Sequence, residues 1–246
     1  MMSQRFVSAV LIGAVLTVIG STSLWGGYIY PVTWDYVTDF STTVNQVPDS
    51  EGNVTWEYRG GWFNYAPSDF LLMPQYSSTL HAWYSPDHKW GNATWGQVGK
   101  SEEGKGFVIA SEPGANYNRP MINWVSPVNR CVNIDLSVLD TGSHGTTGDP
   151  NQDLYLRTDI YVNDSWVHTF SRDGEFQLPL AVVKDDVVHV RFSYRNVPSD
   201  LTGHYAWSND LNFTVTTIPE PATLSLLFLG GCTVLCRRRR ASLPKG

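Results

Sequence analysis

Short segments in which apolar and polar residues alternate are the feature that most constrains this chain. The clearest runs from Val132 to Val138, where apolar side chains occupy every second position and polar ones lie between them. The segments 156–162 and 188–194 show the same pattern. A period of two residues is typical of a β-strand that buries one face. Half-buried strands are therefore expected to dominate the fold.

Turn-forming residues separate these segments. Asn163-Asp164-Ser165 predicts a hairpin turn, and Arg172-Asp173-Gly174 and Lys184-Asp185-Asp186 predict two more turns. No long helical pattern interrupts the region 24–217, so the sequence predicts an all-β fold, an antiparallel β-sandwich with jelly-roll-like architecture. Further strands are expected at 54–58, 70–73, 79–84, 106–110, 121–125, 166–170, 176–183 and 211–215, and irregular segments at 85–103, 141–149 and 196–203.

Both ends of the chain have the composition of targeting segments. Arg5 precedes an apolar stretch from Phe6 to Ile19, and small residues follow up to Ser23. This is the pattern of a secretory signal peptide, expected to form a helix. The other end carries a short hydrophobic helix followed by arginines. The expected division is a signal peptide at 1–23, a β-sandwich domain at 24–217 and a tail at 218–246.

The tail is short for a membrane anchor. The uncharged run from Ala222 to Cys236 holds 15 residues, and a helix of that length spans only ~22 Å of a ~30 Å hydrocarbon core. A brief stay in the inner membrane therefore fits as well as a lasting one. The basic cluster after the run should remain cytoplasmic, which places the domain on the far side of the membrane.

The tail resembles the PEP-CTERM sorting signal of exported bacterial proteins. The resemblance implies an exosortase, a membrane cysteine protease, as processing partner, and a final place in the cell envelope or outside the cell. An ordinary single-span anchor is the alternative. The residues that carry the resemblance are Pro219, Glu220 and Pro221, then the apolar run, then Arg237, Arg238, Arg239 and Arg240.

The domain itself is similar to sandwich domains of exported environmental bacterial proteins, over residues 34–216. Those domains resemble carbohydrate-binding modules in architecture, which alone does not establish sugar binding. One departure is the Lys-Asp-Asp turn at residue 184, where such domains usually have Gly-Asp. The similar segments are Asp39-Phe40-Ser41, Trp56-Glu57-Tyr58, Ile122 to Pro127, Ile160 to Asp164 and Val183 to Val188.

Charge and cysteine content exclude several classes of protein. Residues 24–218 contain 11 basic and 22 acidic residues, a formal charge of −11. Such a domain repels nucleic acid, so no nucleic-acid partner is expected. Cys131 is the lone cysteine of the domain, so an internal disulfide is excluded. We expect Cys131 to be a small buried apolar residue rather than a reactive thiol.

Catalytic and metal-binding motifs are absent from the sequence. There is no Gly-x-Ser-x-Gly elbow and no pair of histidines at zinc-binding spacing. His189 is expected on the solvent side of its strand. The run Asp149 to Asp153 offers oxygens to a structural Ca²⁺, but it lacks the regular spacing of a calcium loop, which favours a solvated acidic turn. No cofactor or catalytic residue is expected.

A cluster of aromatic residues is the strongest candidate site. Trp83, Tyr84, Trp90 and Trp95 lie among polar residues in a segment punctuated by Gly and Pro. Flat aromatic faces beside polar donors are suited to stacking sugar rings. The alternative is that these residues belong to the core, because tryptophan is usually buried. Four other tryptophans are assigned to the core: Trp56, Trp62, Trp124 and Trp207.

The sequence therefore predicts an exported, non-enzymatic β-sandwich that contacts polysaccharide. The alternative is a secreted glycan hydrolase or lyase on the same fold, which would need two carboxylates across a cleft. Exposure of Trp90 beside Trp95 would favour binding, and burial of both would favour a purely structural protein.

Overall fold

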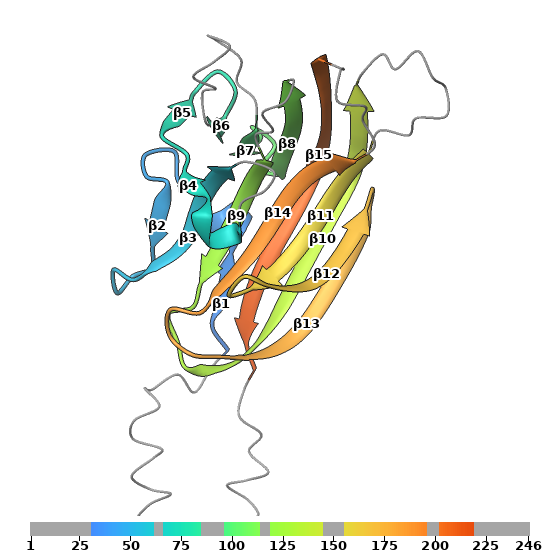
Figure 1. Cartoon of the computed structure of the whole chain (residues 1–246). Coiled ribbons are helices and arrows are strands. Elements are labelled where there is room, and N and C mark those ends of the chain that lie inside the picture. The colour runs from blue at the N-terminus through green and yellow to red at the C-terminus, as the bar shows by residue number, and fades with distance from the viewer. Residues whose placement is uncertain are drawn as a thin grey trace, which may run out of the picture.

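The computed structural model describes residues 31–61, 66–84, 96–113, 119–144, 155–195 and 202–218, which form two antiparallel sheets packed face to face (Figure 1). The predicted antiparallel β-sandwich is thereby confirmed. In sheet A the order is β13 (Gly174–Val182), β10 (Arg130–His144), β15 (Thr202–Thr217), β8 (Gly106–Pro113), β7 (Gln97–Lys100), β6 (Ala82–Tyr84) and β5 (Gln75–Ser77), with β1 (Thr33–Asp35) also paired to β15.

Sheet B lies opposite sheet A. From β8 onward, most connections cross from one sheet to the other, so hydrophobic faces of both sheets are built from interleaved parts of the chain. The order in sheet B is β12 (Ser165–Ser171), β11 (Tyr155–Val162), β14 (Val187–Arg195), β9 (Arg119–Val125), β3 (Val54–Gly61) and β2 (Gln46–Pro48), with β4 (Leu71–Leu72) paired to β3. Two short helical turns complete the described part: α2 (Tyr36–Asp39) and η1 (Pro67–Asp69).

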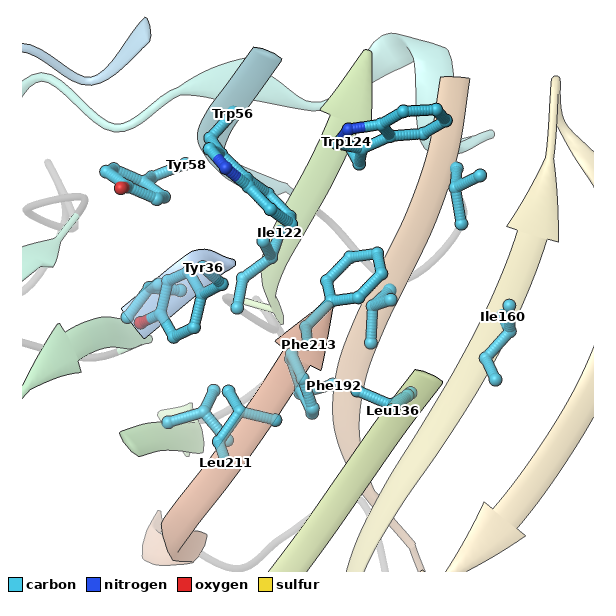
Figure 2. Packing of buried hydrophobic residues seen from close by; sticks show 14 of the residues in the cluster. Tyr36, Trp56, Tyr58, Ile122, Trp124, Leu136, Ile160, Phe192, Leu211 and Phe213 are labelled. Carbon is cyan, nitrogen blue, oxygen red and sulfur yellow. The ribbon is translucent and has the colours of Figure 1, made fainter. Parts of the chain in front are cut away.

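Large aromatic side chains fill the space between the sheets (Figure 2). The Trp56 ring meets Phe213 edge-on at a centroid distance of 5.0 Å, and Tyr36 lies edge-on to Trp56 at 6.2 Å. The Tyr36 hydroxyl donates to the Gly99 carbonyl at 2.7 Å, which satisfies its only polar group inside the core. Full burial of each such side chain contributes about 1.5–3 kcal/mol. Trp124, fully buried, belongs to the same cluster.

The predicted hairpin turn connects β11 and β12. Asn163 and Asp164 have φ values of 47° and 64°, the left-handed conformations of a type I′ turn. The Asn163 side chain donates from Nδ2 to Asp186 Oδ1 at 2.8 Å, linking this turn to the one that joins β13 and β14. The Asn-Asp-Ser signal in the sequence therefore predicted both the position and the type of connection.

The alternation of buried and exposed residues is interrupted at the same level in the paired strands β10 and β15. Leu139 pairs with Asp210 and Thr141 with Ser208, and Asp140 between them has a φ of 50°. On its other side, β15 shifts register against β8 between Ser208 and Leu211. The Ser208 hydroxyl donates to the Leu139 carbonyl at 2.7 Å. The alternation of buried residues changes here. Odd-numbered residues from 211 to 215 face the core, whereas before the irregularity the even-numbered Ala206 and Ser208 are buried.

Four expectations about strands and side chains are corrected. β7 lies within the segment 85–103 that we expected to be irregular, and β10 and β15 extend into the expected loops 141–149 and 196–203. Pairing with neighbouring strands extends them beyond the local pattern. Cys131 is exposed, not buried, because it lies on the outer face of β10.

The two ends of the described domain leave it side by side. β1 pairs with the end of β15, with Thr33 opposite Thr216, and Val32 N donates to Thr217 Oγ1 at 2.8 Å. The predicted signal helix and hydrophobic tail helix lie outside the described residues. Among the residues that are described, no helix has the length and apolarity needed to cross a membrane.

Candidate functional site

Trp83, the first residue of the predicted aromatic site, belongs to the core. Its side chain is 6% exposed, and its ring lies 5.6 Å from Tyr76 and 6.3 Å from Tyr58, centroid to centroid. The indole Nε1 donates to the Ser41 carbonyl at 2.7 Å. Neither ring face is free for a ligand, so the core alternative holds for this residue. Trp90 and Trp95 lie outside the described residues.

Tyr84 has the opposite orientation. Because Trp83 faces the core, Tyr84 faces outward from β6, and its side chain is half-buried. Its hydroxyl donates to Gln75 Oε1 of β5 at 2.7 Å. The residue therefore remains available as part of a surface site on sheet A.

A continuous row of uncharged residues crosses the outer face of sheet A from Tyr84. Strand pairing joins Tyr84 to Gln97, then Ile109, then Trp207. We call this set of residues the aromatic row: Gly142, Trp207, Ile109, Gln97, Tyr84 and Gln75, together with Tyr205.

Trp207 is the central member of the aromatic row, which corrects its predicted place in the core. The irregularity in β15 reverses the alternation, so Trp207 faces outward and is half-buried. Its ring lies against Gly142, where an added Cβ would come within 2.4 Å of Cζ2. Tyr205 lies beside it with a centroid distance of 5.4 Å. The pairing of a glycine with a tryptophan indicates a ring that lies across the sheet. Gly142 and Trp207 are far apart in the sequence, so this pairing can be recognised only once the strand register is known.

The aromatic row has the composition of a site for an uncharged ligand. It presents partly exposed rings of Trp207, Tyr205 and Tyr84 and the amide of Gln75. Rings supply flat apolar faces, and amide and hydroxyl groups supply hydrogen bonds without charge. Such a surface can stack sugar rings and bind hydroxyl groups.

The outer face of sheet B is different, since its polar side chains are buried. Glu57, Asn123 and His189 are directly paired across β3, β9 and β14 and are 7%, 1% and 4% exposed. Glu57 Oε1 accepts from Gln46 at 2.7 Å, and its Oε2 accepts from Arg59 at 2.7 Å and from Asn123 at 3.2 Å. Burial raises the pKa of Glu57, but these hydrogen bonds outweigh burial and hold the pKa below its usual value.

His189 is buried, which corrects the expected position on the solvent side. Its Nδ1 lies 2.9 Å from Asn123 Oδ1, and because Asn123 donates its amide to Glu57, the imidazole Nδ1 carries the proton. Burial lowers the pKa of His189 to about 4, since desolvation disfavours the imidazolium. The imidazole is therefore neutral at pH 7 and acts as one link of a hydrogen-bonded chain.

A second buried carboxylate, Asp159, lies between two arginines on the same face. Arg157 donates from Nε and Nη2 to its Oδ1, both at 2.8 Å, and Arg191 donates from Nη2 to its Oδ2 at 3.0 Å. The Thr169 hydroxyl also donates to Oδ1, at 2.6 Å. Trp166 Nε1 donates to Thr169 Oγ1 at 2.9 Å, which ties an exposed indole to this network.

The remaining predicted sites lie outside the described residues. Within the described ranges, no group of three or more His, Cys, Asp or Glu side chains is placed to hold a metal ion. The calcium candidate, 149–153, and the sorting residues 219–221 and 237–240 lie outside those ranges.

Comparisons with known proteins assign no family. No protein-family model and no curated protein matches the chain. Among solved structures, the CBM36-1 domain of a multidomain xylanase from the hindgut metagenome of Trinervitermes trinervoides matches with 8% identity and a TM-score of 0.28, over 50% of this chain and 86% of that domain. A CBM29-2 mutant complexed with mannohexaose matches with 12% identity and a TM-score of 0.27, over 65% and 93%.

A third match is CBM35 from Paenibacillus barcinonensis, with 17% identity and a TM-score of 0.22, over 45% of this chain and 89% of that one. These TM-scores are too low to assign a shared fold or function. The description of the domain as a β-sandwich rests on its own strand pairing.

Proposed function

We propose that this protein is an exported, non-catalytic β-sandwich that contacts neutral polysaccharide through the aromatic row. The observation that carries the proposal is the placement of Trp207 on Gly142 beside Tyr205, in register with Tyr84. A tryptophan that could have been buried instead lies partly exposed in a row of uncharged residues on the outer face of sheet A. Sugar rings have apolar faces that stack on such side chains.

The aromatic row is tested by binding of the full-length protein to soluble neutral glycans such as hydroxyethyl cellulose, laminarin and galactomannan. Trp207→Ala should weaken binding to the best ligand about tenfold, which corresponds to ~1.4 kcal/mol. Trp166→Ala, the same substitution on the opposite face, is the matched control and should leave this binding unchanged. Equal binding by wild type and Trp207→Ala would remove the aromatic row as the site.

The same panel tests the absence of catalysis. Incubation with these glycans should release no reducing ends. Turnover that disappears on substitution of a single carboxylate would replace the binding proposal with the glycosidase alternative.

The proposal includes sorting by the tail, which rests on the resemblance of residues 219–240 to a PEP-CTERM signal. An exosortase would process the chain after transient insertion in the inner membrane, and the domain would then reside in the envelope or outside the cell. Mass spectrometry of the protein from its own cells should find a C-terminus near Pro219. A mature protein that retains Arg237 to Arg240 would contradict processing.

A further inference from the structure

Positive charge gathers on the outer face of sheet B. Four arginines project from it, one from each of four strands: Arg59 of β3, Arg119 of β9, Arg157 of β11 and Arg191 of β14. The carboxylates on the described strands of this face are Glu57 and Asp159. The strands of this face therefore carry more arginines than carboxylates, although Asp164 of the β11–β12 turn also approaches the face, 3.9 Å from His189 Nε2. Residues 24–218 as a whole carry a formal charge of −11. A Debye length of ~8 Å at physiological salt lets this local excess act on a ligand.

The excess is centred on Asp159. Two guanidinium groups, those of Arg157 and Arg191, share this single carboxylate. Hydrogen bonds from Thr169 and Arg191 hold the pKa of Asp159 below its usual value despite its burial, so the carboxylate is ionised. One negative charge between two positive charges leaves a net charge of about +1 at this point.

Arg191 retains unused hydrogen-bonding capacity. The residue is 8% exposed, and in the described part of the chain its Nε has no hydrogen-bond partner. Its guanidinium lies 4.8 Å from the centroid of the Tyr161 ring and donates to the Tyr161 hydroxyl. A buried donor without a partner costs about 1–3 kcal/mol. Because this Nε is itself buried, Arg191 contributes positive charge close to the surface, and the more exposed Arg157 is the guanidinium that an anion can reach.

Trp166 supplies a flat apolar surface next to this charge. It is 62% exposed, which is high for tryptophan, and it lies directly opposite Tyr161 in the β11–β12 pair. Its indole is not free to rotate, because Nε1 donates to Thr169, whose hydroxyl donates to Asp159. An exposed ring in a fixed orientation loses little conformational entropy when a ligand stacks on it.

We propose that Trp166, Tyr161, Arg157 and Arg191 form a second binding site, which takes acidic polysaccharide. A uronate residue has the two features that the site matches: a ring face that stacks on an indole and one carboxylate that pairs with a guanidinium. The site is on the sheet opposite the aromatic row. It therefore goes beyond the proposed contact with neutral polysaccharide and can fail or succeed independently of it.

The test compares two ligands that share one sugar backbone, one with free carboxylates and one with neutral methyl esters. Full-length protein should bind polygalacturonate, and its fully methyl-esterified form should bind at least tenfold more weakly. Binding of polygalacturonate should weaken when NaCl is raised from 50 to 500 mM. Trp166→Ala and Arg157→Gln should each weaken it at least fivefold, and both side chains are exposed enough for the fold to survive. Circular dichroism checks that each variant is folded.

Two matched controls separate this site from general effects. Lys184→Gln removes one positive charge from an exposed turn elsewhere and should leave polygalacturonate binding unchanged. Trp207→Ala should affect only neutral glycans. The proposal is overturned if polygalacturonate does not bind, if the methyl ester or polyglutamate binds equally well, or if folded Trp166→Ala and Arg157→Gln bind as the wild type does.

Discussion

The outer face of sheet B keeps its polar side chains out of water, whereas that of sheet A leaves them in contact with it. On sheet B, Asn123 and Asp159 are almost fully buried. On sheet A, Asn133 and Asp135 of β10 are half-exposed, with a 2.6 Å hydrogen bond between them. The same residue types therefore have different roles. On sheet B they belong to a buried hydrogen-bond network, and on sheet A they are polar surface residues in contact with water.

A short segment explains part of this difference. Residues 66–70 lie over the outer face of sheet B beside β3, where Pro67 and Phe70 are buried. Arg59 Nη1 donates to the Phe70 carbonyl at 2.5 Å, and Ser68 N donates to Asp164 Oδ1 at 2.8 Å. This part of sheet B is thus covered on both sides, and its charged pair, Glu57 with Arg59, is satisfied inside the protein. An outward-facing side chain is not necessarily an exposed one.

Removal of one carboxylate from each face gives the largest expected contrast. Asp159→Ala should lower the free energy of unfolding by about 3–5 kcal/mol, because it leaves Arg157 and Arg191 without their shared partner. The matched variant Asp135→Ala on sheet A should cost less than about 1 kcal/mol. Urea unfolding followed by circular dichroism measures both. Similar losses for the two variants would show that the faces do not differ in this way.

The pH dependence of stability gives the second contrast. The unfolded chain protonates His189 near pH 6.5, while the folded protein keeps it neutral down to about pH 4. Stability from this group is therefore present above pH 6.5 and is lost as the pH falls from 6.5 to 4, by roughly 3 kcal/mol. His189→Asn, whose amide can replace Nδ1–H, should flatten the curve in this window. A variant with the same slope as the wild type would exclude His189 as its source.

A smaller effect is expected on sheet A. In Gly142→Ala the new methyl group meets the Trp207 ring at 2.4 Å, so the ring must move off the sheet. Because this side chain is partly exposed, it can swing outward, and the cost should be only about 1 kcal/mol. Tryptophan fluorescence should shift to longer wavelength and neutral-glycan affinity should fall. The neighbouring exposed Ser143→Ala should change neither, and an unchanged spectrum in Gly142→Ala would mean that the ring does not rest on this glycine.

Alternation in the sequence predicted the strands well because it reports burial on one face. It found the core side of β10 at Val132 to Val138 and the whole β11–β12 hairpin. It failed for His189 because the outer face of sheet B is buried where β3, β9 and β14 pair, so polar residues there do not mark the solvent side. For Cys131 the alternation indicates the outer face, which it shares with Asn133. The general preference of cysteine for burial indicates the core, and that preference does not hold here.

The candidate site was harder to predict because it depends on register. Trp207 lies beside the strand pattern at 211–215, which predicts a core residue, but the irregularity of β15 between Ser208 and Leu211 reverses the alternation before that strand. Of the predicted aromatic residues, Tyr84 is on the surface and Trp83 is in the core, as neighbours on one strand must be. The arginines of sheet B are far apart in sequence, and only strand pairing brings them together.

The pairing of β1 with the end of β15 has a mechanical consequence. Residues 31 and 218 leave the domain together, with Thr33 opposite Thr216 in antiparallel register. A pulling force applied between the two ends acts at the same end of the β1–β15 pair. It therefore breaks the backbone hydrogen bonds one after another, and β1 should separate from β15 at low force. A force applied between residue 218 and a ligand held at Trp207 instead runs along β15, because both points lie on that strand, and the covalent backbone bears it. A polymer bound at that surface while the tail is held would therefore pull the sandwich along its more resistant direction.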